Sequence, residues 1–159
     1  MRAKLPSEDG AWPAIWLLGE GGRDTWPSEG EIDLVEWSSA LAGTNDSEII
    51  SALHYPDAHA GNANDTTTQL NSPVDDWHTY QLWWDEDSIS IGVDGTKADA
   101  HLVYNKPADA DNDSWPYDGP MDVIMNVAIG GTLGGAVPVN DFSYDMYIDY
   151  VRVYQEITV

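Results

Sequence analysis

The segment GEIDLVEW, residues 30–37, places three carboxylates in a stretch that otherwise has the composition of a buried β-strand. Ile32, Leu34 and Val35 suit a pleated, half-buried surface, whereas Glu and Asp are depleted in strands. The preference of residues for β-strands therefore does not explain the three acids at these positions.

The spacing of the acids predicts an irregularity in this strand. Successive side chains of a regular strand alternate between faces, so Glu31 and Asp33 share one face and Glu36 points to the other. A β-bulge at Leu34-Val35 inserts one extra residue and returns Glu36 to the face of its partners. With this bulge, the three carboxylates lie in a row on one surface.

A row of carboxylates suits the hydrolysis of glycosidic bonds. A retaining glycosidase holds two carboxyl groups about 5–5.5 Å apart, one as nucleophile and one as general acid and base. Asp33 lies between the other two acids, where it can hydrogen-bond the nucleophile and raise the pKa of the acid/base. The alternative is an edge strand with a solvated acidic face. Trp26 and Trp37 on either side favour chemistry, because proteins commonly hold sugar rings against aromatic faces.

Three motifs together resemble glycoside hydrolase family 16. They are WPAIWLLG at residues 12–19, Trp26-Pro27, and the bulged E-x-D-x-x-E spacing of residues 31–36. The bulged spacing is similar to that of the laminarinase type, the endo-β-1,3-glucanases. The resemblance implies an all-β, concanavalin A-like jelly roll of two curved antiparallel sheets. It covers nearly all of residues 1–159, which we interpret as a single domain that is short at its N-terminus compared with the family.

The resemblance also implies a role for each site residue. It makes Glu31 the nucleophile, Glu36 the acid/base and Asp33 the residue that tunes the pair. The substrate contacts that it implies are two sugar platforms and two polar groups, namely Trp16, Trp26, His54 and Asn126. No cofactor is required for this chemistry. In the closing segment DYVRVY, residues 149–154, the resemblance makes Asp149 a ligand of a structural calcium on the convex face.

Composition limits the partners. Lys and Arg number 6 and Asp and Glu 28, which gives a formal net charge of −22. This charge argues against nucleic acid and anionic membrane as partners, because phosphate binding requires positive charge. A neutral β-glucan is compatible with it. The chain contains no cysteine and no apolar run of membrane-spanning length, and the resemblance implies secretion.

Apolar patterns and turn signals outline the remaining elements. Loops are expected at residues 58–72 and 98–118, and glycine-rich turns at residues 130–135. A strand at residues 121–128 should be buried. The other expected strands cover residues 12–18, 48–55, 77–84, 88–93 and 146–154.

The function expected from the resemblance is a retaining endo-β-1,3-glucanase. One alternative is a non-catalytic glucan-binding module or lectin on the same fold, since function follows from the site rather than the fold. A second is a family 16 hydrolase acting on another glucan or galactan, because agarases and carrageenases share the bulged motif. A third is a fragment whose sheets are completed by a second chain.

Overall fold

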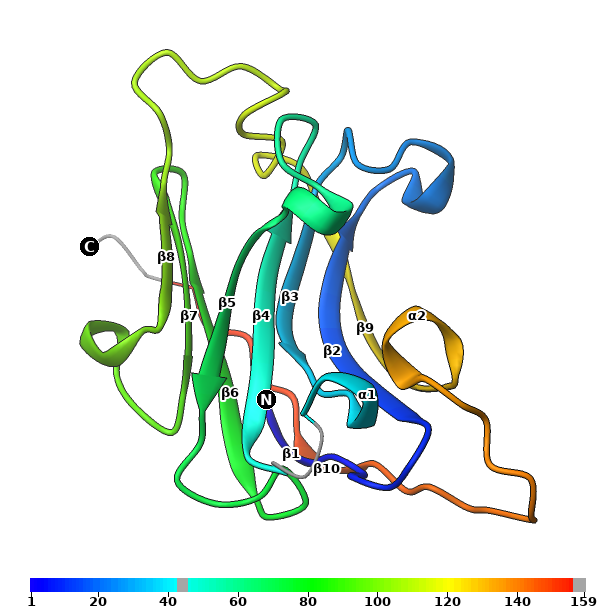
Figure 1. The fold of residues 1–159 in the computed structure, drawn as a ribbon. Helices are drawn as coiled ribbons and strands as arrows, with labels where there is room; N and C mark the ends of the chain where they lie inside the picture. Colours follow the sequence, from blue (N-terminus) through cyan, green and yellow to red (C-terminus); the bar gives the residue numbers. More distant parts are fainter. Residues whose placement is uncertain (43–45, 156–159) are drawn as a thin grey trace.

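Short apolar and alternating segments form ten β-strands in the part of the chain that the computed structural model describes, residues 1–42 and 46–155. The strands build two five-stranded sheets that face each other (Figure 1). One sheet has the order β10-β1-β6-β7-β8 and the other β5-β4-β3-β2-β9, and all neighbouring strands are antiparallel. The predicted all-β sandwich of two antiparallel sheets is confirmed.

The bounds of the strands place the predicted motifs on the second sheet. WPAIWLLG lies in β2 (Ala11–Gly19) and the acidic segment in β3 (Glu31–Glu36), which is the central strand. Around them lie β4 (Glu48–His54), β5 (Asn64–Gln69) and β9 (Met121–Ile129). The first sheet contains β1 (Arg2–Lys4), β6 (His78–Trp84), β7 (Ser88–Val93), β8 (Leu102–Asn105) and β10 (Tyr147–Tyr150).

The core lies between the sheets, where β2 and β3 present alternate apolar side chains. Ile15 of β2 packs in one cluster with Ala3 of β1 and Tyr80 of β6. Leu17 packs in a second cluster with Ile89 and Ile91 of β7. Burying an aliphatic side chain of this size contributes about 1.5–3 kcal/mol. The opposite face of β2 is therefore free to line a site.

The predicted bulge is present in β3. Between Asp33 and Glu36 the chain advances three positions, while the paired residues of β4 advance only from Ala52 to Ile50. The register against β2 shifts at the same place. Both consecutive side chains of the bulge, Leu34 and Val35, consequently point into the core, with 1% and 0% of their surface exposed.

Two strands lie where the sequence predicted only loops, and these two predictions are wrong. Strand β5 falls within residues 58–72, and β8 within residues 98–118. Both lie at sheet edges. The segment NDTTTQ of β5 alternates in burial but contains no large apolar side chain, so it carries no hydrophobic period. Edge strands of this kind are held by backbone pairing and by β-branched threonine.

Two other predictions need correction in extent or burial. Strand β9 was expected to be buried, yet it is an edge strand with Val123 41% and Met125 39% exposed. Strand β10 is shorter than the predicted strand, because its ladder to β1 ends at Tyr150.

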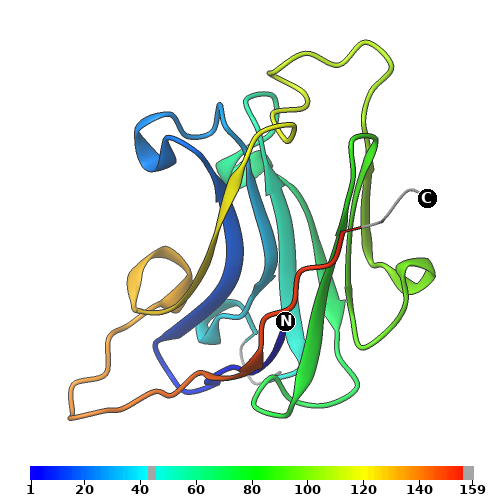
Figure 2. The ribbon, with the colours of Figure 1, turned by 180° about the vertical axis from the view of Figure 1, so that it is seen from behind.

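The connections are short or irregular. Single turns form α1 (Ser39–Ala42), α2 (Gly131–Gly134) and the 3-10 segments η1 (Gly22–Asp24), η2 (Ala60–Asn62) and η3 (Lys97–Asp99). The predicted glycine turns at residues 130–135 occur, with positive φ at Gly130, Gly131 and Gly135. Figure 2 shows the segment after α2 passing from the second sheet to β10 in the first. No helix in the described ranges is long and apolar enough to cross a membrane.

Candidate active site

The face of the second sheet that points away from the core is hollowed into a cleft of about 430 Å³. The even positions of β2 form its floor, because the odd positions are committed to the core. Neighbouring side chains come from β3, β9 and the loop between β2 and β3. The lining residues are Trp12, Ala14, Trp16, Leu18, Arg23, Trp26, Glu31, Asp33, Glu36, Asn126 and Ala128.

All three carboxylates of β3 line this cleft. Glu31 and Asp33 reach it by ordinary alternation, and Glu36 reaches it because the bulge absorbs one residue. Asp33 is only 3% exposed, whereas Glu31 and Glu36 are half-buried. The structure thus brings together the acids that the sequence singled out.

Tryptophan N–H groups hold the two outer acids. Trp12 Nε1 donates to Glu36 Oε1 at 2.9 Å. Trp26 Nε1 donates to Glu31 Oε2 at 2.5 Å. Hydrogen bonds to an ionised acceptor are shorter and stronger than neutral ones, so each indole orients its carboxylate and favours its charged form.

A third indole organises the amide in the cleft. Trp16 Nε1 donates to Asn126 Oδ1 at 2.8 Å across the β2–β9 pair. The bond leaves the amide N–H₂ of Asn126 as a donor on the cleft side, where both residues are lining groups. Asn126 therefore lies in the cleft, and its contact with substrate stays a prediction.

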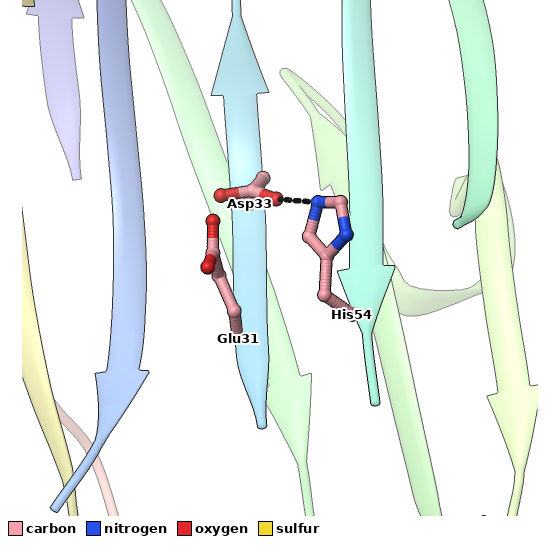
Figure 3. A group of neighbouring side chains, drawn as sticks. All are labelled: Glu31, Asp33 and His54. Atoms are coloured by element: carbon pink, nitrogen blue, oxygen red, sulfur yellow. Dashed lines mark ion pairs between the residues drawn. The ribbon is translucent and has the colours of Figure 1, made fainter. Parts of the chain in front are cut away.

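His54 lies beside Asp33 rather than among the side chains that line the cleft. Figure 3 shows its ring on β4 pointing toward Asp33 of the neighbouring strand, with Glu31 on the other side of Asp33. His54 Nε2 is 3.1 Å from Asp33 Oδ2. This is an ion-pair distance but not a well-aligned hydrogen bond, and Oδ2 has no other partner among the residues described. A substrate contact by His54 stays a prediction.

The acids perturb one another. Burial, and then the negative charge of Asp33, raise the pKa of Glu31 from 4.5 to about 7. Burial also raises the pKa of Glu36, against the opposing hydrogen bond from Trp12. Burial and the charge of Glu36 raise the pKa of Asp33 well above its usual range. Three carboxyls this close titrate as a group, so near neutral pH the trio holds at least one proton.

This arrangement supplies both a proton donor and an ionised carboxylate in one cleft. Perturbed pKa values in a hollow lined by aromatic side chains are a general mark of functional sites. One acid can give up a proton while a neighbour, held by an indole N–H, stays ionised.

The cleft fits a metal-binding site less well than it fits a pair of reacting carboxyl groups. Glu31, Asp33 and His54 form the one group of three potential ligands found among the described residues, with ligand atoms within 4.8 Å of one another. However, the Ala60 N–H donates to His54 Nδ1 at 3.2 Å, so the proton of the neutral ring lies on Nε2, the nitrogen nearest the carboxylates. A protonated nitrogen is not a metal ligand.

The residues around Asp149 do not by themselves fit a calcium ion. The Asp149 carboxylate pairs with Arg2 at 2.7 Å on the surface of the first sheet. A calcium ion takes six to eight oxygen ligands, and no cluster of three acidic or histidine ligands includes Asp149 within residues 1–42 and 46–155. Calcium binding at Asp149 stays a prediction.

Five lining residues were not among the predicted site residues, and two of them carry a polar group. The five are Trp12, Ala14, Leu18, Arg23 and Ala128. Strand alternation places Trp12 on the same face of β2 as Trp16, but no role in the site was predicted for it. Arg23 lies in η1, where no periodicity indicates which way a side chain points.

The fold and site together define a class of protein. A β-sandwich with a row of carboxylates in an aromatic-lined hollow on one sheet contains the groups that hydrolysis of a glycosidic bond requires. Residues 1–152 match the Glycosyl hydrolases family 16, and the chain belongs to this family.

Several relatives are glucanases of greater length. The chain is 36% identical to glucan endo-1,3-beta-glucosidase A1 of Niallia circulans, with 98% of the chain and 24% of that protein covered. It is 33% identical to the beta-glucanase of Rhodothermus marinus, with 98% of the chain and 56% of that protein covered. The crystal structure of a laminarinase from Flavobacterium sp. UMI-01 is 34% identical and superimposes with a TM-score of 0.78, over 91% of this chain and 60% of that one. The chain thus spans between a quarter and three-fifths of the length of these proteins.

Proposed function

We propose that this protein is a retaining endo-β-1,3-glucanase that cleaves laminarin-like glucans. The observation that carries the proposal is the β3 bulge, which brings Glu31, Asp33 and Glu36 into one cleft. The indole donors on the two outer acids support it, because each fixes the carboxyl group that would react.

The chemistry proceeds in two displacements. The Glu31 carboxylate attacks the anomeric carbon while Glu36 donates its proton to the leaving glycosidic oxygen, which forms a covalent glycosyl-enzyme. Glu36, now ionised, removes a proton from water, and the resulting hydroxyl displaces Glu31 from the sugar. Asp33 supports this chemistry because three carboxyl groups in one cleft resist carrying three negative charges, so the group retains a proton that Glu36 can donate.

The proposed glucan lies along the cleft on its aromatic groups. Trp16 and Trp26 provide flat apolar surface for sugar rings, and the free N–H₂ of Asn126 reaches hydroxyl groups. The names of the relatives support β-1,3-glucan as the substrate class. A neutral chain also suits a protein of net charge −22, and secretion follows from the need to reach a polymer.

One experiment tests both the activity and the substrate. Reducing-end release is measured on laminarin, mixed-linkage glucan, agarose and carrageenan with the wild type and with Glu31→Gln and Glu36→Gln. We expect laminarin to be cleaved fastest, and each variant to lose activity by at least about 10³-fold. Glu48→Gln, at the far end of β4 and outside the cleft, is the matched control.

The same measurement separates the competing functions. Tight laminarin binding without turnover by the wild type would indicate a binding module instead of an enzyme. Faster cleavage of agarose or carrageenan would move the substrate to a galactan. Proton NMR of the first product tests the mechanism, since retention yields the β-anomer before mutarotation.

A further inference from the structure

Ala60 adopts an unusual backbone conformation next to the candidate site. Its φ of +50° lies in the left-handed region, which a residue with a Cβ rarely occupies. Ala60 belongs to the loop of residues 55–63 between β4 and β5. Such a conformation persists only where the surrounding structure holds it. It therefore suggests a role for the backbone group whose direction it fixes.

The conformation of Ala60 directs its backbone N–H toward the ring of His54. This N–H donates to His54 Nδ1 at 3.2 Å. A backbone N–H can only donate, so Nδ1 must be the acceptor nitrogen of the imidazole. The proton of the neutral ring therefore sits on Nε2.

The protonated nitrogen faces the buried acid. His54 Nε2 lies 3.1 Å from Asp33 Oδ2. Figure 3 marks this ion pair with a dashed line. The Oδ2 oxygen is fully shielded from solvent, and the Nε2 of His54 lies within ion-pair distance of it. An unpaired buried carboxylate oxygen is costly, so a donor at this distance favours the charged form of Asp33 and opposes the effect of burial.

Further contacts hold both the backbone and the ring of His54. Its backbone carbonyl accepts a hydrogen bond from the Tyr117 hydroxyl at 3.1 Å. Its ring packs against Trp26, with centroids 5.8 Å apart, and His59 of the same loop meets Trp26 edge-on at 5.5 Å. Because Trp26 donates to Glu31, the loop supports two of the three carboxylates.

We propose that the β4–β5 loop, acting through the Nε2–H of His54, positions Asp33 for the reaction. His54 is in this view a positioning residue and not a contact of the sugar. The inference rests on the proposed glucanase function, and it assigns the loop the task of fixing the tautomer of His54. Preorganised donors of this kind stabilise charge without reorganisation during the reaction.

Kinetics of two variants at position 54 test the proposal. His54→Leu removes the donor, and we expect kcat on laminarin to fall by about 10- to 100-fold with KM within about 3-fold. His54→Gln places an amide N–H₂ near the position of Nε2 and should recover most of kcat. A loss shared equally by Gln and Leu would overturn the proposal, as would a large rise in KM at unchanged kcat, which would mark a sugar contact.

A measurement on the wild-type protein is independent of activity. ¹⁵N-edited NMR of the His54 ring should show a protonated Nε2 and a bare Nδ1. A proton on Nδ1 would overturn the proposal, whatever the enzyme does. If the wild type cleaves no glucan, the proposed function fails while the ring spectrum still decides the tautomer. Thermal melts of both variants confirm that the fold is retained.

Discussion

Trp12 and Glu36 are joined across neighbouring strands by a hydrogen bond of 2.9 Å from the indole Nε1 to the carboxylate Oε1. The bond exists because the bulge turns Glu36 toward β2, where Trp12 lies on the face that lines the cleft. It favours the ionised form of Glu36, and so opposes the rise in pKa that burial causes. The protonation of the proposed acid/base thus depends in part on this hydrogen bond, which acts against the effect of burial.

Replacing Trp12 should change that proton. Trp12→Phe keeps an aromatic ring and removes the N–H donor, so the pKa of Glu36 should rise further. The alkaline limb of the pH profile of kcat/KM, where the acid/base loses its proton, should then move to higher pH. Trp16→Phe is the control, because its indole donates to Asn126 and not to an acid. A limb that moves equally in both variants would contradict the assignment of Glu36.

The acid limb of the same profile should report Glu31. Burial and the charge of Asp33 raise its pKa to about 7, and Glu31 must be ionised to act as the proposed nucleophile. Below about pH 7, kcat/KM should therefore fall by about tenfold for each pH unit. Laminarin does not titrate in this range, so the limb belongs to the enzyme. An acid limb near pH 4–5 would show that Glu31 keeps an ordinary pKa.

The raised pKa of Glu31 also predicts an effect on stability. Between its ordinary pKa of 4.5 and about 7, the folded protein retains a proton that the unfolded chain has lost. The free energy of unfolding should therefore decrease as pH rises through this window. Glu31→Gln removes the penalty, so the variant should gain roughly 1–2 kcal/mol over the wild type at pH 8, after allowance for partial exposure, and little at pH 4.

Urea unfolding at the two pH values measures this difference. Glu48→Gln, which removes a carboxylate outside the cleft, gives the background effect of the change in net charge. Equal gains by Glu31→Gln at pH 4 and pH 8 would show that burial does not perturb this carboxyl group.

The acidic segment was predictable because its signals are local. Three acids at positions 31, 33 and 36 conflict with alternation unless one residue is bulged, and the apolar residues between them fix which face is buried. By contrast, β5 was missed because threonine and asparagine at an edge carry no hydrophobic period. The burial of β9 was overestimated because an apolar segment does not reveal that its strand has a neighbour on one side only.

The contacts of His54 could not be predicted from the sequence, for a different reason. The sequence predicted a strand that includes His54, but it did not predict the left-handed conformation of Ala60, whose N–H donates to His54 Nδ1. Arg23 lies in a loop, where side-chain direction depends on tertiary contacts. The alternation of apolar and polar residues thus predicts which face of a strand a residue occupies. The partner of a polar atom depends on loops, whose conformation cannot be read from such alternation.

Gly30 supplies a last prediction, because it leads directly into Glu31. Its φ is +76°, and a Cβ at this position would lie 2.8 Å from Cε1 of Tyr117. Gly30→Ala should therefore lower the free energy of unfolding by about 1–3 kcal/mol. It should also reduce kcat, because relief of the clash moves Glu31 or the Tyr117 hydroxyl that holds His54. Gly119→Ala is the matched control, since its Cβ would meet nothing within 4 Å and its φ is not left-handed. Urea unfolding and laminarin kinetics of the two variants test this prediction. If Gly30→Ala and Gly119→Ala had the same free energy of unfolding and the same kcat, the contact with Tyr117 would not constrain the start of β3.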